Sequence, residues 1–100
     1  MYAAFCQNGS FVYIGNFSTN VRLIKLLNYT EFGQVLAIRW KADTHSLYIS
    51  GANQPSANVS SMFFKIYNVL EDSEEDISSF FSHKVIDFDF SPDGVYLYYL

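Results

Sequence analysis

The sequence predicts an all-β fold, and three observations support this prediction. Half of the residues are hydrophobic and 19% are aromatic, with ten Phe and eight Tyr, residue types that favour pleated strands over helices. No segment shows a convincing helical periodicity. A unit made of an aromatic residue, a turn and an apolar-Tyr-apolar strand also recurs three times without gaps.

The clearest copy of this unit is residues 85–100, VIDFDFSPDGVYLYYL. Its first half alternates between apolar and polar residues, and its second half is rich in aromatic residues, so both halves read as strands. Ser91-Pro92-Asp93-Gly94 between them has the composition of a tight turn, because proline fixes φ, Asp bonds its own backbone and Gly accepts positive φ. We therefore expect a hairpin here.

The other two copies precede this hairpin by 85 and 50 residues. The aromatic position is Phe5, Trp40 or Phe90. The turn position is Asn8, Asp43 or Asp93, and the residue after Asp93 is Gly94. The strand that follows is Val12-Tyr13-Ile14, Leu47-Tyr48-Ile49 or Leu97-Tyr98-Tyr99. Three copies in one register predict that the chain is built from repeated strand units.

Further strands complete each unit. Residues 21–27 and 61–69 are predicted to form a third strand, because KLLN in the first aligns with KIYN in the second at an offset of 40. Residues 29–32 and 77–82 are candidates for a fourth, outer strand. Four strands per unit, repeated every 35 to 50 residues or so, are typical of β-propeller blades. The sequence therefore predicts one partial propeller over residues 1–100, with blade segments at about residues 1–32, 33–82 and 83–100.

The chain begins and stops within blades when the copies are aligned, which gives about two and a half blades. A propeller closes as a ring of roughly four to eight blades. Fewer blades would leave apolar faces and strand edges open to water. We therefore expect the chain to act with the remaining blades of a larger propeller, or with other copies or partner proteins.

The sequence resembles the WD-repeat family of β-propellers. His83 followed by VIDFDFSPDG resembles the opening half of a WD repeat, and the segment FKIYN resembles its closing strand, with Tyr67 and Asn68 where Trp and Asp commonly stand. The repeats are degenerate, because the second unit has Phe32-Gly33 where a Gly-His pair is expected. The resemblance implies that Phe5, Trp40, Asp43, His83, Phe90, Asp93 and Gly94 are structural blade positions.

The resemblance implies a non-catalytic scaffold for protein–protein interaction within a multiprotein complex. Fold alone does not establish function, so this is an expectation by analogy. The alternative is the propeller portion of a hydrolase whose catalytic residues lie outside this chain. YIGN at residues 13–16 is similar to lactonase-like propellers, and residues 90–99 are similar to the propeller of prolyl-peptidase relatives.

No catalytic, cofactor-binding or metal-binding constellation is expected from the sequence. His45 and His83 are not at a metal-ligand spacing, and His45 is expected to be exposed beside its turn. Asp87 and Asp89 alternate with apolar residues, so they are expected to share one side of a strand, where a blade-surface role is commoner than catalysis. Cys6 is expected to be a small buried side chain in a strand.

Two polar loops are the expected partner-contact sites. The first covers residues 51–60 and includes Asn53 and Gln54. The second is an acidic run that contains Glu71, Asp72, Glu74, Glu75 and Asp76, and it reads first as a solvated loop. A docking patch for a basic partner, or a phosphorylation site at Ser73, is the sharper alternative.

Charge and cysteine content limit the partners and the compartment. The net charge is −4 and no basic stripe is present, so a nucleic-acid partner is not expected. No apolar run is long enough for a membrane span. A single cysteine favours a cytoplasmic or nuclear location. Four Asn-x-Ser/Thr triplets, at Asn8, Asn16, Asn28 and Asn58, leave a luminal or extracellular location as the alternative.

Overall fold

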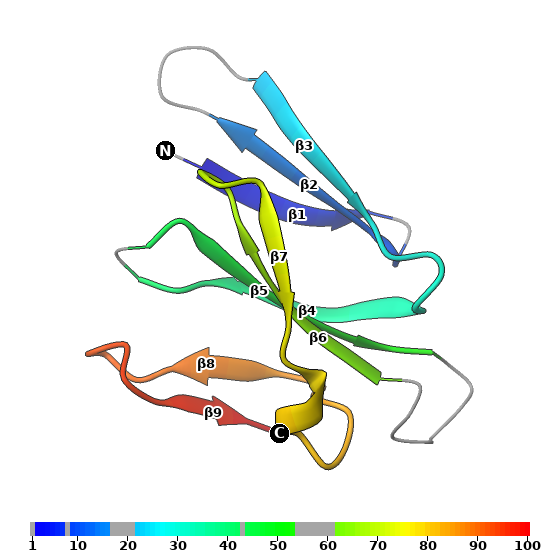
Figure 1. Cartoon of the computed structure of the whole chain (residues 1–100), viewed down its shortest axis with the longest axis vertical. Coiled ribbons are helices and arrows are strands. Elements are labelled where there is room, and N and C mark those ends of the chain that lie inside the picture. Colours follow the sequence, from blue (N-terminus) through cyan, green and yellow to red (C-terminus); the bar gives the residue numbers. More distant parts are fainter. Residues whose placement is uncertain (1, 8, 17–21, 43, 54–61) are drawn as a thin grey trace.

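The computed structural model describes residues 2–7, 9–16, 22–42, 44–53 and 62–100, and in this part of the chain the fold is all-β (Figure 1). The described strands form three antiparallel sheets, and the described helical structure is a short 3₁₀ helix, η2 (Ser78–Phe80). The all-β prediction is confirmed. The three sheets lie one above another in Figure 1, in the order of the sequence.

The strands follow the chain order within each sheet. The first sheet contains β1 (Tyr2–Gln7), β2 (Phe11–Asn16) and β3 (Arg22–Asn28). The second sheet contains β4 (Gln34–Trp40), β5 (Ser46–Ala52), β6 (Met62–Asn68) and β7 (Ser73–Asp76). The third sheet contains β8 (Phe88–Phe90) and β9 (Leu97–Tyr99).

Strand pairing in the first two sheets reproduces the repeat seen in the sequence. Val12 lies opposite Leu27 in the first sheet, and Leu47 lies opposite Tyr67 in the second. These pairs are related by the same offsets, 35 and 40, that align the sequences. The first five residues of β2 and β5 also share one pattern of buried and half-buried side chains. The repeated unit is therefore a structural unit in these two strands.

The predicted outer strands are wrong in both units. Residues 77–82 contain η2, because the Asp76 carboxylate accepts a hydrogen bond from the Ser78 amide (2.9 Å) and turns the chain. Residues 29–32 form a turn in which the Tyr29 carbonyl accepts bonds from Phe32 and Gly33. The outer strand of the second sheet is instead β7, which comes from the acidic run expected to be a loop.

The second sheet is buried on both faces. One face packs against the first sheet around Val12, Ile14, Leu47, Ile49, Phe63 and Tyr67. The opposite face packs against the third sheet around Ala52, Met62, Phe64, Val85 and Phe88. A register shift in β4 between Val35 and Ala37 lets this strand contribute Val35 to the first core, and Leu36 and Ala37 to the second.

The two sheet interfaces are of different kinds. Val12 and Leu47 occupy equivalent positions in the repeat, yet both point into the core between the first and second sheets. These sheets therefore pack through equivalent faces. Leu97, the equivalent residue of the third sheet, packs instead on the Tyr48 side of the second sheet. A propeller repeats this second, head-to-tail arrangement at every interface, so the first interface differs from regular propeller stacking.

The first hairpin also differs from the others in its register. Phe90 lies opposite Leu97, and Trp40 lies opposite Leu47, seven positions later in both cases. Phe5 lies opposite Tyr13, eight positions later. A slip of one residue sends a side chain to the opposite face of a sheet. Phe5 consequently lies on the outer face of the first sheet, 51% exposed and stacked on Tyr13, whereas Trp40 and Phe90 lie against the cores.

Candidate functional site

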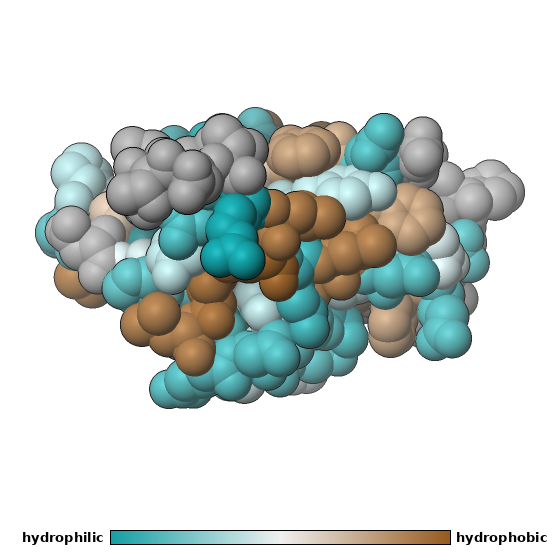
Figure 2. Space-filling model, turned by 90° about the horizontal axis from the view of Figure 1, so that it is seen from above, coloured by the Kyte–Doolittle hydropathy of each residue, from teal (hydrophilic) through white to brown (hydrophobic). Residues whose placement is uncertain are grey.

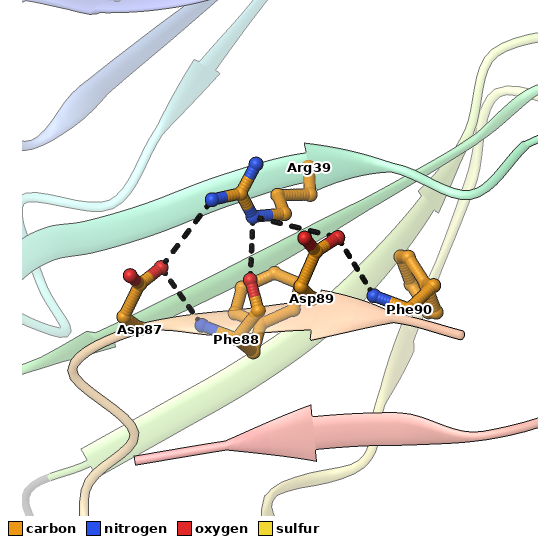
Figure 3. Close-up of polar contacts among 5 residues, drawn as sticks. All are labelled: Arg39, Asp87, Phe88, Asp89 and Phe90. Carbon is orange, nitrogen blue, oxygen red and sulfur yellow. Dashed lines mark hydrogen bonds and ion pairs between the residues drawn. The ribbon is translucent and has the colours of Figure 1, made fainter. Parts of the chain in front are cut away.

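Arg39 of β4 makes the main polar link between the second and third sheets. Its Nε donates a hydrogen bond to the Phe88 carbonyl at the start of β8 (Figure 3). Its guanidinium also lies 3.7 Å from the Asp87 carboxylate and 4.0 Å from the Asp89 carboxylate. Asp87 and Asp89 therefore lie on the same side of the chain, as predicted from their alternation.

Each of these carboxylates also orders the backbone beside it. Asp87 accepts a hydrogen bond from the Phe88 amide (2.9 Å), and Asp89 accepts one from the Phe90 amide (2.8 Å). The Arg39, Asp87 and Asp89 side chains are all about half exposed or more, so salt and water weaken their attraction. The geometry fits a clamp that aligns two sheets.

A hollow of about 270 Å³ opens beside this clamp. Its lining residues come from β4 and from both strands of the third sheet: Arg39, Asp87, Phe88, Asp89, Tyr98, Tyr99 and Leu100. Two carboxylates against one guanidinium leave this hollow with a formal charge of −1. A small aromatic molecule with a cationic group would match the charge and the aromatic side chains of this lining. The Arg39 guanidinium and the Asp87 and Asp89 carboxylates, however, already pair with one another.

The acidic run at residues 71–76, which contains β7, is tied to the first sheet by two Tyr–carboxylate–Lys sets. In one set the Tyr67 hydroxyl donates to Asp72 (2.6 Å), whose carboxylate lies 3.0 Å from the Lys25 ammonium. In the other set, the Tyr29 hydroxyl donates a hydrogen bond to the Glu74 carboxylate (3.1 Å). This carboxylate lies 3.3 Å from the Lys65 ammonium. These contacts explain why an acidic run pairs as a strand.

The contact between Tyr67 and Asp72 shifts the pKa values of the two groups in opposite directions. Burial, and then the bond to Asp72, raises the pKa of the Tyr67 hydroxyl. Burial, and then the negative charge of Glu74, raises the pKa of the Tyr29 hydroxyl. The hydrogen bonds from Tyr67 and Lys25 lower the pKa of the Asp72 carboxyl. The carboxylates of Asp72 and Glu74 therefore have partners inside the molecule, whereas Glu71 and Glu75 are exposed.

The predicted turn at Ser91 to Gly94 is confirmed in detail. The Gly94 amide donates to the Ser91 carbonyl (2.9 Å), and Gly94 has a φ of +75°. The Asp93 carboxylate accepts bonds from the Ser91 hydroxyl and the Val95 amide. These bonds lower the pKa of the Asp93 carboxyl. Asp93 and Gly94 thus have the turn roles that their residue types indicated.

The two histidines are both exposed, as expected for His45. Nδ1 of His83 lies 3.0 Å from the Lys84 carbonyl, and its ring lies 5.6 Å from the Tyr99 ring. In the described part of the chain, no three His, Cys, Asp or Glu side chains form a group that could hold a metal ion. Likewise, no described helix is long and apolar enough to cross a membrane.

The prediction for Cys6 is wrong in one respect. Cys6 lies in β1, as expected, but its side chain is exposed. It lies opposite Val12, next to the turn that joins β1 to β2. Of the residues predicted in the first contact loop, Asn53 is exposed and Gln54 lies outside the described residues. Asp43, predicted as a turn and blade position, also lies outside them.

The sequence reasoning missed an apolar surface on the first sheet. Leu23, Ile24 and Leu26 of β3 are 60%, 43% and 45% exposed, and Phe5 is exposed on the outer face. Figure 2 views the molecule from the side of the first sheet and shows hydrophobic side chains gathered among polar ones. The signal was the run LIKLL, which is more apolar than a solvated edge strand needs.

Comparison with known proteins found no matching family model, no matching curated protein and no matching solved structure.

Proposed function

We propose that this chain is a non-catalytic protein–protein interaction scaffold, built from WD-like repeats and acting within a multiprotein complex. The observation that carries the proposal is the exposure of apolar side chains at both ends of the three-sheet stack. Phe5 and Leu26 are exposed at the first sheet, and Tyr98 (63%) and Leu100 (71%) at the third. Apolar patches of this kind are typical of surfaces that another protein covers.

The propeller part of the proposal has support from one interface. The second and third sheets pack head to tail, as successive blades do, with aromatic contacts such as Tyr48 on Phe90 at 4.8 Å between ring centres. The face-to-face packing of the first sheet argues against a regular ring. No arrangement of the described residues favours the alternative, the propeller portion of a hydrolase.

Site-specific photo-crosslinking tests the scaffold proposal. A benzophenone amino acid replaces Phe5 on the first sheet, or Tyr98 on the third, in cells that express the chain. A control variant carries it at Glu71, an exposed polar position. We expect discrete adducts from the two apolar positions and none from the control. Equal or absent adducts at all three positions would contradict the proposal.

The compartment is a separate part of the proposal, for which we favour the cytoplasm or nucleus. Among the described Asn residues of the glycosylation triplets, Asn28 is exposed. Its carboxamide oxygen accepts hydrogen bonds from the Thr30 amide and hydroxyl. Asn16 lies within β2, and Asn8 and Asn58 lie outside the described residues. A shift in gel mobility after endoglycosidase treatment would instead establish a luminal or extracellular location.

A further inference from the structure

Among the described strands, none pairs with the outer edge of β3, whereas the equivalent edge of β6 pairs with β7. The first sheet has the order β1-β2-β3, and no described strand pairs with the far side of β3. In the second sheet β7 pairs antiparallel with that side of β6, with Ile66 opposite Glu75 and Asn68 opposite Ser73. Among the described strands, the second sheet therefore has an outer strand at a position where the first sheet has none.

We propose that the β3 edge receives an extended acidic segment of a partner protein, which adds to the first sheet as β7 adds to the second. This inference rests on the scaffold function proposed above, and it names a docking site and the chemistry of the partner. Strand addition of this kind draws its affinity from main-chain hydrogen bonds and its specificity from alternate side chains.

The backbone of β3 is oriented for this addition. The Tyr29 amide donates to the Ser10 carbonyl (2.8 Å), in the position where the Val69 amide donates to the His45 carbonyl (2.9 Å) in the second sheet. Backbone groups alternate between the two sides of a strand. Leu26 consequently directs its amide and carbonyl away from β2, as Ile66 does toward β7.

The side chains of β3 leave this edge unprotected. Exposed sheet edges usually carry charged side chains that prevent pairing with another chain. The four residues of β7 are all exposed and three are acidic, so the second sheet ends in such an edge. On β3 the exposed residues include Leu23, Ile24 and Leu26, and Lys25 is directed to Asp72 at 3.0 Å.

Charge favours an acidic segment over a second copy of β3. The strand contains two cations, Arg22 and Lys25, and no acidic residue. Antiparallel pairing of two β3 strands with Lys25 opposite Lys25, or with Arg22 opposite Lys25, would bring like charges together, and like charges directly opposite destabilise a sheet. The Ser-Glu-Glu-Asp sequence of β7 shows that an acidic strand pairs with the equivalent strand, where Lys65 lies 3.3 Å from Glu74.

A peptide titration tests the inference. The probe is a fluorescein-labelled peptide with the sequence of residues 70–79, LEDSEEDISS, titrated with the full chain at physiological salt and followed by anisotropy. The test variant is Leu26→Pro, which removes an amide directed away from β2 and so keeps the β2–β3 ladder. The control is Leu26→Val. We expect saturable binding to the wild type and to Leu26→Val, and at least a tenfold weaker affinity for Leu26→Pro.

Hydrogen exchange of the wild-type chain provides a measurement that does not depend on the variant folding. Saturating peptide should protect the Leu26 amide and leave the Leu27 amide, already paired with β2, unchanged. Equal binding of a peptide with Gln and Asn in place of Glu and Asp would overturn the acidic specificity. Absence of binding would overturn the docking site, as would a dimer of the free chain that Leu26→Pro abolishes. Crosslinks at Phe5 and Tyr98 that persist in those cases would leave the scaffold function standing.

Discussion

Ser50 shows what it costs a single residue to lie in a sheet that is buried on both faces. Its side chain is fully buried on β5, and its hydroxyl has no hydrogen-bond partner among the described residues. A buried polar group without a partner costs about 1–3 kcal/mol. Ser50→Ala is therefore expected to raise the free energy of unfolding by about 1 kcal/mol, measured by urea denaturation.

Ser10 provides the matched control for this prediction. Its hydroxyl donates to the Gly33 carbonyl at 2.7 Å and links the first hairpin to the turn before β4. Ser10→Ala is expected to lower the free energy of unfolding by about 0.5–1.5 kcal/mol, the usual net contribution of one hydrogen bond. Equal effects of both substitutions would contradict the assignment of Ser50 as unpartnered.

Tyr67 should make the stability of the protein depend on alkaline pH. Its pKa is raised in the folded state by burial and by the bond to Asp72, relative to an ordinary value of 10.0. The folded state therefore holds this proton more tightly, and that stabilisation is present below pH 10 and lost as the pH rises above it. Unfolding midpoints measured between pH 8 and 11 should fall less steeply for Tyr67→Phe than for the wild type. Tyr98→Phe, at an exposed position, should follow the wild type.

At the scale of the element, the turn of the third hairpin was predictable because its interactions are local. Proline, Asp and Gly act on backbone groups within five residues of one another, so the sequence contains all the necessary information. The repeat alignment was also predictable for β2, β3, β5 and β6, because an apolar-Tyr-apolar triplet and a Lys-x-x-Asn segment recur at fixed offsets. The outer strand β7 was not, because two of the side chains that contact this acidic run, Lys25 and Tyr29, lie more than 40 residues earlier in the chain.

Asp93 should make this turn sensitive to acid. Hydrogen bonds from the Ser91 hydroxyl and the Val95 amide lower its pKa below the ordinary value of 3.8. The stabilisation is therefore present above pH 3.8 and is lost as the pH falls through the lower, folded-state pKa. We expect Asp93→Ala to reduce stability at pH 7 and to reduce it less at pH 2. Thermal unfolding at the two pH values measures the difference, and an equal loss at both would contradict the role of the carboxylate.

For the whole molecule, the way in which the sheets pack against one another could not be predicted from the sequence. The repeat predicts equivalent units, and equivalent units predict equivalent interfaces. The one-residue difference in the register of the first hairpin breaks this rule, because it places Phe5 outside and leaves Ala4 to pack on the second sheet. A register difference of this kind depends on loop geometry and on packing partners together. The Arg39 clamp was missed because its partners lie about 50 residues away in the sequence.

Because both cores share the second sheet, the three sheets are expected to unfold as one unit. Phe88 is 3% exposed in the core between the second and third sheets, where its ring lies 4.9 Å from that of Phe64. Phe88→Ala is expected to cost about 3–5 kcal/mol, a large part of the stability of a domain of this size. Phe80→Ala, at a side chain that is 81% exposed, should change stability by less than about 0.5 kcal/mol.

Trp40 reports whether that loss crosses the second sheet. It is the single tryptophan of the chain, and it packs against the other core, between the first and second sheets. If the molecule unfolds cooperatively, Phe88→Ala will shift the Trp40 fluorescence transition and the circular dichroism transition to the same lower denaturant concentration. If the Trp40 transition stays in place, the third sheet unfolds independently. The head-to-tail interface would then be a weak junction, and the two-sheet body around Trp40 would be the stable unit of the protein.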